Sequence, residues 1–109
     1  MRHNQIGELE ENVLLIVAVL YGDAYGFTIR NEMEERSGRS ISIGALRTTL
    51  ARLEEKGFLE STLGEPTKIR GGKRKRFYTV TRLGKKVLGQ IRDNRNYLWD
   101  SIPDTAFNF

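Results

Sequence analysis

Cysteine is absent from the 109-residue sequence, and histidine occurs once, at position 3. Without cysteine the chain can form no disulfide, no thiolate zinc site and no cysteine nucleophile. We expect His3, close to one end of the sequence, to be a solvated side chain rather than a metal ligand or part of a catalytic triad. The motifs also supply no converging carboxylates, so we predict no metal, no cofactor and no enzymatic activity.

Long hydrophobic runs and proline are also scarce. The longest apolar run, Val13 to Tyr21, has nine residues, whereas a helix needs about 20 to cross a bilayer. No secretory signal pattern is visible, so we expect a soluble, cytoplasmic protein that does not bind membranes. With two prolines and no repeat or Pro/Ser-rich linker, the chain is expected to form one small domain, which dimerisation would help to stabilise.

Positive charge is concentrated in one short stretch. The chain has 18 Lys and Arg residues against 14 Asp and Glu residues, a formal net charge of +4. Six of the basic residues occupy nine positions that hold no acid: Lys68, Arg70, Lys73, Arg74, Lys75 and Arg76. Without them the rest of the chain is slightly acidic. Taken alone, such a segment is typical of a solvated surface or a general polyanion-binding patch.

The first half of the chain shows the spacing of two helices. Apolar residues recur at helical intervals in the first segment, at Leu9, Val13, Ile16, Val17 and Leu20. This helix is expected to be buried nearly all round. Either one face packs on the domain core and another on a partner subunit, or it is a central helix without partner contact. After a turn at Gly22, Asp23 could cap a second helix that ends near Gly38.

A third helix has the clearest boundary signals. Ser42 can cap its first turn, Ile41 and Leu46 can form a hydrophobic staple across it, and Gly57 follows its end. The predicted core stripe is Ile43, Leu46, Leu50 and Leu53. The outward positions are short or basic and precede the first acid, Glu54: Ser42, Ala45, Arg47, Thr48, Thr49 and Arg52.

The remaining chain alternates between strand and helix patterns. Strands are predicted at Phe58 to Leu63 and Arg76 to Thr81. The loop between them, residues 64–75, contains most of the basic cluster and is called the wing below. Its Gly71-Gly72 pair indicates a turn, since it lacks the spacing of a phosphate-cradling loop. Helical spacing then runs from Leu83 to Ile102, Pro103 ends the helix, and residues 104–109 are expected to be a loose tail.

This order predicts a mainly α winged helix-turn-helix with a small β-hairpin. We assign residues 1–81 to the winged helix, 82–103 to a C-terminal dimerisation helix and 104–109 to the tail. A helix from Ser42 to Lys56 is about 22 Å long and fits the DNA major groove, which is about 12 Å wide. The predicted groove contacts are Ser42, Arg47, Thr48, Thr49 and Arg52. The predicted phosphate contacts are Lys68, Arg70, Lys73, Arg74, Lys75 and Arg76.

Several short motifs occur between residues 7 and 92: Ala24-Tyr25-Gly26, Ile29, Ser42 to Leu46, Thr49-Leu50, Arg52 to Leu59, Arg70 to Tyr78 and Thr81 to Gly84. Through these motifs the sequence resembles the PadR-like transcriptional regulators. The resemblance implies a bacterial DNA-binding protein that acts as a homodimer, usually as a repressor, with its first and last helices at the dimer contact. One position departs from the family pattern, because Arg47 stands where tyrosine is common. The short C-terminal part matches the compact members.

A dimer would give the C-terminal apolar stripe a role. The predicted interface comprises Leu9, Val13, Leu83, Val87, Ile91, Asn94, Leu98 and Ile102, with Asn94 in a position to fix the register. Alternatively, this helix folds back on its own domain. In some compact members of the family an aromatic residue here stacks on a flat ligand, so Trp99 is a candidate for an unidentified small-molecule effector, or simply packs at the interface.

The function favoured by the sequence is that of a DNA-binding regulator on a near-palindromic operator. The alternative is an interaction module that binds a protein or RNA partner through the basic wing.

Overall fold

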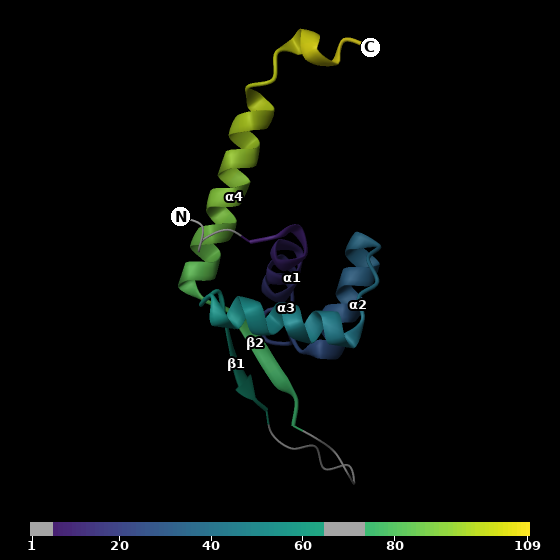
Figure 1. Cartoon of the computed structure of the whole chain (residues 1–109), viewed down its shortest axis with the longest axis vertical. Coiled ribbons are helices and arrows are strands. Elements are labelled where there is room, and N and C mark those ends of the chain that lie inside the picture. Colours follow the sequence, from purple (N-terminus) through teal and green to yellow (C-terminus); the bar gives the residue numbers. More distant parts are fainter. Residues whose placement is uncertain (1–5, 65–73) are drawn as a thin grey trace.

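In the computed structural model, residues 6–64 and 74–109 are described. The helices and strands follow one another in the predicted order (Figure 1), and the fold is a mainly helical winged helix with one antiparallel hairpin. The elements are α1 (Glu8–Val19), α2 (Gly26–Ser37), α3 (Ile43–Glu55), β1 (Leu59–Leu63), β2 (Arg76–Val80), α4 (Arg82–Asp100) and a 3₁₀ turn (Asp104–Phe107).

The hydrophobic core lies between the first three helices and is closed by the hairpin and the start of α4. Val13, Leu14 and Val17 of α1 are fully buried. Ile29 and Met33 meet them from α2, while α3 contributes Leu46, Leu50 and Leu53. However, α1 is not buried all round, because Leu15 and Val19 remain exposed. One side of this helix is therefore left without cover in the described part of the chain.

The structure confirms most of the predicted helix ends. The Ser42 hydroxyl accepts the Ala45 N–H at 3.0 Å, and Gly38 and Gly57 both adopt positive φ at the ends of α2 and α3. The predicted cap at Asp23 was wrong. The buried Ala24 extends the turn, so α2 begins after Tyr25, whose backbone N–H donates to the Thr28 hydroxyl at 3.0 Å.

Two contacts attach the hairpin to the helical body. The strands pair with Leu59 opposite Val80 and Ser61 opposite Tyr78. The Tyr78 N–H donates to the Ala24 carbonyl at 2.8 Å, which links β2 to the turn before α2. The rings of Tyr25 and Phe77 also meet edge to face with centroids 5.4 Å apart. The segment just before α2 thus holds β2 through both its backbone and a side chain.

The start of α4 is fixed by a tight junction with the hairpin. Thr81 accepts the Gly84 N–H at 3.0 Å and donates its hydroxyl proton to the Gly57 carbonyl at 2.6 Å. A Cβ at Gly84 would lie 2.4 Å from the Phe58 carbonyl oxygen. Only glycine fits here, and its absence of a side chain lets the first turn of α4 approach the Phe58 backbone between α3 and β1.

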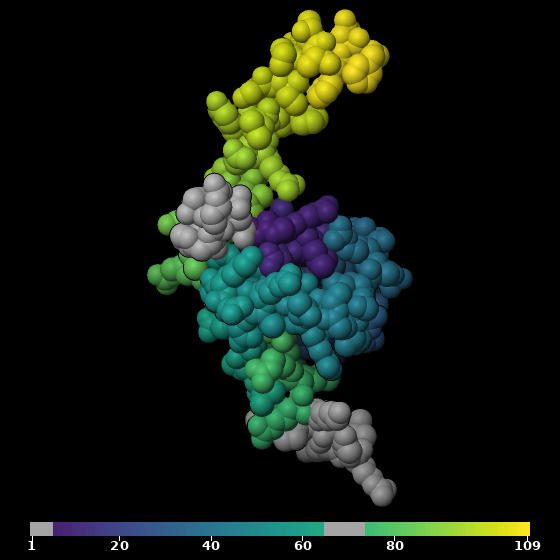
Figure 2. All heavy atoms as spheres, in the orientation of Figure 1, coloured from purple at the N-terminus to yellow at the C-terminus, as the bar shows by residue number. Residues whose placement is uncertain are grey.

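Beyond this junction, α4 leaves the domain. Figures 1 and 2 show its C-terminal half standing clear of the other helices. The Cα radius of gyration is 16.8 Å, against about 13 Å for a compact chain of this length. Within the segment predicted to be a tail, a 3₁₀ turn places the ring centroid of Phe107 6.2 Å from that of Trp99 and 6.1 Å from that of Phe109.

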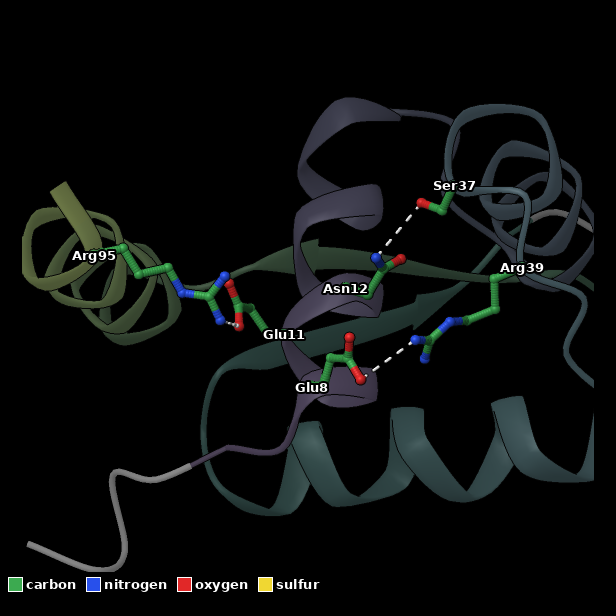
Figure 3. A network of polar contacts seen from close by, with 6 residues as sticks. All are labelled: Glu8, Glu11, Asn12, Ser37, Arg39 and Arg95. Carbon is green, nitrogen blue, oxygen red and sulfur yellow. Dashed lines mark hydrogen bonds and ion pairs between the residues drawn. The ribbon is translucent and has the colours of Figure 1, made fainter. Parts of the chain in front are cut away.

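Polar contacts brace both sides of α1 (Figure 3). Glu11 accepts a hydrogen bond from Arg95 of α4 at 2.9 Å, while Glu8 pairs with Arg39 at 3.5 Å. Asn12 donates to Ser37 at the end of α2 at 3.5 Å. The Glu11–Arg95 pair holds α4 beside α1 near the point where α4 begins to project.

A more buried ion pair joins α1 to the end of α3. The Glu10 carboxylate accepts hydrogen bonds from Lys56 Nζ at 2.9 and 3.2 Å and from the Gly7 N–H at 2.9 Å. Burial alone would raise the pKa of this carboxyl, but these bonds and the charges of Lys56 and Arg52 lower it below its ordinary 4.5. Ionised Glu10 therefore stabilises the fold.

We expect Glu10→Gln to destabilise the protein by about 1–3 kcal/mol at pH 7, since it removes charge-assisted hydrogen bonds. A folded-state pKa below the unfolded one gives stability that is present above the unfolded pKa and lost as pH falls through the folded value. Urea unfolding at one protein concentration should thus show the two proteins converging below about pH 4. Glu35→Gln, at an exposed position, is the control. If Glu10→Gln lowered the free energy of unfolding equally at every pH, the ionised Glu10 carboxylate would not be the source of the stability.

Candidate nucleic-acid interface

The outer face of α3 is flat, polar and free of acid over its first three turns. Of the five residues predicted to contact a DNA groove, four are exposed: Ser42, Arg47, Thr48 and Arg52. Between them, Gly44 and Ala45 are also exposed, and a Cβ on Gly44 would meet nothing within 4 Å. The backbone at the start of α3 is therefore open to a close-fitting ligand.

Two positions on α3 were predicted wrongly. Thr49 is only 5% exposed and donates its hydroxyl proton to the Ala45 carbonyl at 2.8 Å, because its side of the helix faces the start of α1. Thr49 therefore cannot reach a groove. Conversely, Ile43 was expected in the core and is 45% exposed. It is the first residue of α3, beyond the end of the core, and no described element covers it.

The two arginines of this face lie beside different hollows. Arg47 lines a groove of about 560 Å³ between the start of α2, α3 and the base of the wing, which we call the wing groove. Arg52 lines a separate hollow with Gly7 and Leu9 at the start of α1. The exposed face of α3 thus offers one basic side chain toward the wing and one toward α1.

The wing groove is strongly basic. Its lining includes five basic side chains and no acidic one: Arg30, Arg47, Arg74, Lys75 and Arg76. Three of the predicted phosphate-contacting residues, Arg74, Lys75 and Arg76, are exposed here. The other three, Lys68, Arg70 and Lys73, lie outside the described residues. Such a concentration of one charge on a concave surface favours a polyanion.

Neighbouring side chains hold two of the wing cations in place. Lys75 Nζ lies 4.4 Å from the centre of the Tyr25 ring and 3.4 Å from its hydroxyl oxygen. Arg76 donates to the Ser61 hydroxyl at 3.0 Å, and Ser61 donates to Glu54 at 2.8 Å. These contacts hold Lys75 against the start of α2 and Arg76 against β1.

Sequence reasoning missed the contribution of α2, and of Tyr78 on β2, to this groove. Tyr25, Phe27 and Arg30 line it from the start of α2, and Tyr78 lines it from β2. Arg30 also donates to the Ile41 carbonyl at 2.9 Å, which ties α2 to the segment before α3. The aromatic Tyr25-Gly26-Phe27 run at a helix start was a signal for this surface. Burial and the nearby Glu54 raise the pKa of Tyr78, so its hydroxyl stays protonated.

A second groove lies between α1 and α4, on another face of the molecule. This α1–α4 groove measures about 890 Å³, with Leu15, Ala18 and Leu88 among its apolar lining residues. Its basic lining residues are Arg82, Lys85, Arg92 and Arg95. Glu11 is the one acidic residue that lines this groove, and its carboxylate accepts a hydrogen bond from Arg95 (Figure 3).

Two residues predicted to form the dimer interface are buried in the core of their own chain. Val13 is fully buried and Val87 nearly so, because both belong to the hydrophobic core of the domain. Leu9, Ile91 and Ile102 are partly buried, whereas Leu83, Asn94 and Leu98 are exposed. The suggestion that the last helix folds back on its own domain thus holds for the first half of α4 only.

Two other findings concern the described residues as a whole. Within residues 6–64 and 74–109, no helix is long and apolar enough to cross a membrane. In the same ranges, no three His, Asp or Glu side chains converge on a position suited to a metal ion.

Comparison with known proteins relates this architecture to solved structures. A PadR-like transcription factor from Bacteroides fragilis is 23% identical, with 85% of this chain and 84% of that chain covered and a TM-score of 0.72. A transcriptional regulator from Clostridium thermocellum is 26% identical, with 83% of this chain and 84% of that chain covered and a TM-score of 0.67. A PadR family regulator from Eggerthella lenta is also 26% identical, with 85% of this chain and 80% of that chain covered and a TM-score of 0.66.

No curated protein matches the sequence significantly. The model of the "Transcriptional regulator PadR-like family", however, matches residues 13–90, most of the chain. That span includes the exposed face of α3, the wing and the first half of α4. The chain therefore belongs to the PadR-like family of DNA-binding transcriptional regulators.

Proposed function

We propose that the protein is a sequence-specific regulator that binds DNA as a homodimer, with α3 in the major groove and the wing along the neighbouring phosphates. The observation that carries this proposal is the wing groove, in which five basic side chains and no acid adjoin the flat outer face of α3. Phosphate contacts supply affinity, while base contacts in the groove supply sequence choice. This surface has side chains suited to both.

Within this arrangement, the side chains divide into two roles. Arg47 and Thr48 are proposed to contact base edges, and Arg52 to contact a base or phosphate further along α3. Arg74 and Lys75 are proposed to contact phosphates, together with Lys68, Arg70 and Lys73. Arg76 is held by Ser61 and is proposed to follow the same backbone. Ser42 offers its hydroxyl at the helix start, although its oxygen already accepts the Ala45 N–H.

The projecting half of α4 supports the homodimer. Leu98 and Trp99 are exposed there, and the α1–α4 groove offers a hollow with an apolar floor that a second copy can fill. In a two-fold dimer the two α3 helices would lie about one DNA turn, roughly 34 Å, apart. The operator is then a near-palindrome, and the proposed mode of action is repression by occupying it. Trp99 remains the proposed stacking residue for any small-molecule effector.

The salt dependence of DNA binding tests the wing. If about three wing charges per subunit neutralise phosphates, the dimer releases counterions from about six, and log K falls against log salt with a slope of about −5. We expect Lys73→Ala/Arg74→Ala/Lys75→Ala to flatten this slope markedly, measured by fluorescence anisotropy on a duplex selected from a random pool. Lys86→Ala, an exposed lysine lining neither groove, should leave it unchanged. An unchanged slope in the triple variant would refute the wing assignment.

Removing the Arg47 side chain tests the placement of α3. We expect Arg47→Ala to weaken binding to the selected duplex by about 10- to 100-fold, the range of one good base contact. Binding to bulk DNA should weaken far less, so the specificity ratio falls. Arg36→Ala, on the exposed side of α2, is the matched control. Equal losses on selected and bulk DNA would place Arg47 on the phosphates instead.

A charge on the projecting part of α4 tests the dimer. We expect Leu98→Glu to halve the mass measured by light scattering, from twice 12.5 kDa to the single-chain value, because burying an unpaired carboxylate at an apolar contact is unfavourable. Tyr21→Glu, at an exposed site outside both grooves, should keep the dimer. A dimeric Leu98→Glu variant would exclude this segment from the interface.

A further inference from the structure

An exposed aliphatic side chain stands at the entrance of the basic wing groove. Ile43, the first residue of α3, is 45% exposed and lines this groove with Arg47. Phe27, 69% exposed, extends the apolar surface from the start of α2. Most apolar side chains of the described residues pack into the core or against it, whereas these two sit among Arg30, Arg47 and Lys75 without cover. Exposed apolar side chains that share a groove with five basic residues suit a ligand that is both anionic and locally apolar.

Duplex DNA has one group of this kind in its major groove. The C5-methyl group of thymine is the apolar feature displayed there, beside the acceptors and donors of the base edges. The surrounding phosphates match the five basic residues of the wing groove. An acidic protein surface would satisfy the same charges, but it does not require a flat, small-residue helix face. Gly44 and Ala45 beside Ile43 provide such a face, and a Cβ on Gly44 would meet only open space.

Ile43 also has a defined relation to the proposed base-reading residue. Arg47 follows four positions later, so the two side chains share one side of α3 and lie about 6 Å apart along its axis. That distance is close to the rise of two base pairs, about 6.8 Å. The Ser42 side chain, by contrast, is engaged in capping the helix. Ile43 is therefore the apolar residue best placed to meet a base near the one that Arg47 contacts.

We infer that Ile43 contacts the C5-methyl group of a thymine in each half-site, within about two base pairs of the base contacted by Arg47. This inference rests on the proposed function, because it requires α3 to enter the major groove. It adds a specificity-determining residue on the side of α3 that the sequence pattern assigned to the core. The operator should then contain, in each half, a thymine whose methyl group matters for binding.

Replacing thymine by uracil tests this contact, since the two bases differ only by the methyl group. Duplexes are first selected from a random pool, and each conserved thymine is then changed singly to deoxyuridine. We expect one position per half-site at which the wild-type affinity falls about fourfold, equivalent to about 0.8 kcal/mol for one apolar group. Ile43→Ala should bind the thymine duplex about fourfold more weakly and should no longer distinguish it from the uracil duplex.

Two comparisons make the result specific to Ile43. Val19→Ala shortens an aliphatic side chain of similar exposure, 51%, on α1 outside both grooves, and should keep the preference for thymine. Circular dichroism and thermal unfolding check that Ile43→Ala folds normally. If no uracil substitution weakens specific binding by the wild type, or if Ile43→Ala keeps the preference, the inference is wrong while the proposed function stands. If no duplex is bound specifically, both fall.

Discussion

The close approach of Gly84 to the Phe58 carbonyl is the constraint on which the arrangement of the molecule depends. At this point the end of α3, the first strand and the start of α4 meet, and a single methyl group would lie 2.4 Å from a backbone oxygen. The Thr81 hydroxyl bonds both Gly57 and Gly84 across the same junction. The direction of α4 and the seat of the hairpin are therefore fixed together by backbone atoms, and surface residues can vary around them.

The charge distribution follows from this frame. The hairpin carries its cations away from the core and toward α3, and the Tyr25 and Ser61 side chains orient Lys75 and Arg76. The acidic residues of α1, by contrast, form ion pairs within the body of the molecule: Glu10 with Lys56, and Glu11 with Arg95. Opposite charges are thus paired on the inner side of the molecule, while unbalanced positive charge collects where α3 and the wing adjoin.

Much of this fold could be predicted from local signals. The Ser42 cap and the glycines at 38 and 57 mark helix ends through their own backbone chemistry, so no tertiary information was needed. Periodicity alone could not show where the core stops along a helix.

Ile43 illustrates this limit, because it continues the stripe of Leu46, Leu50 and Leu53 but lies beyond the elements that cover them. Thr49 belongs to an outward series by composition, yet it faces the start of α1. Val13 and Val87 fit an interface stripe equally well in sequence, but both are buried in the core of one chain. The Tyr25-Gly26-Phe27 run hinted at a surface at the start of α2, but the hydrogen bond from Tyr78 to Ala24 that brings β2 beside it is a long-range contact.

The short connection between β2 and α4 has a mechanical consequence. Only Thr81 separates the two elements, so the seat of the hairpin on the helical body and the Gly84 junction together set the direction of the 19-residue rod of α4. At 1.5 Å per residue that rod is about 28 Å long, and a rotation of about 10° at its base displaces its far end by about 5 Å. The angle of α4 at this junction thus sets where Trp99 and Phe107 lie relative to the hairpin. In the proposed homodimer, a small change in that angle would alter the spacing between the two hairpins on a DNA duplex.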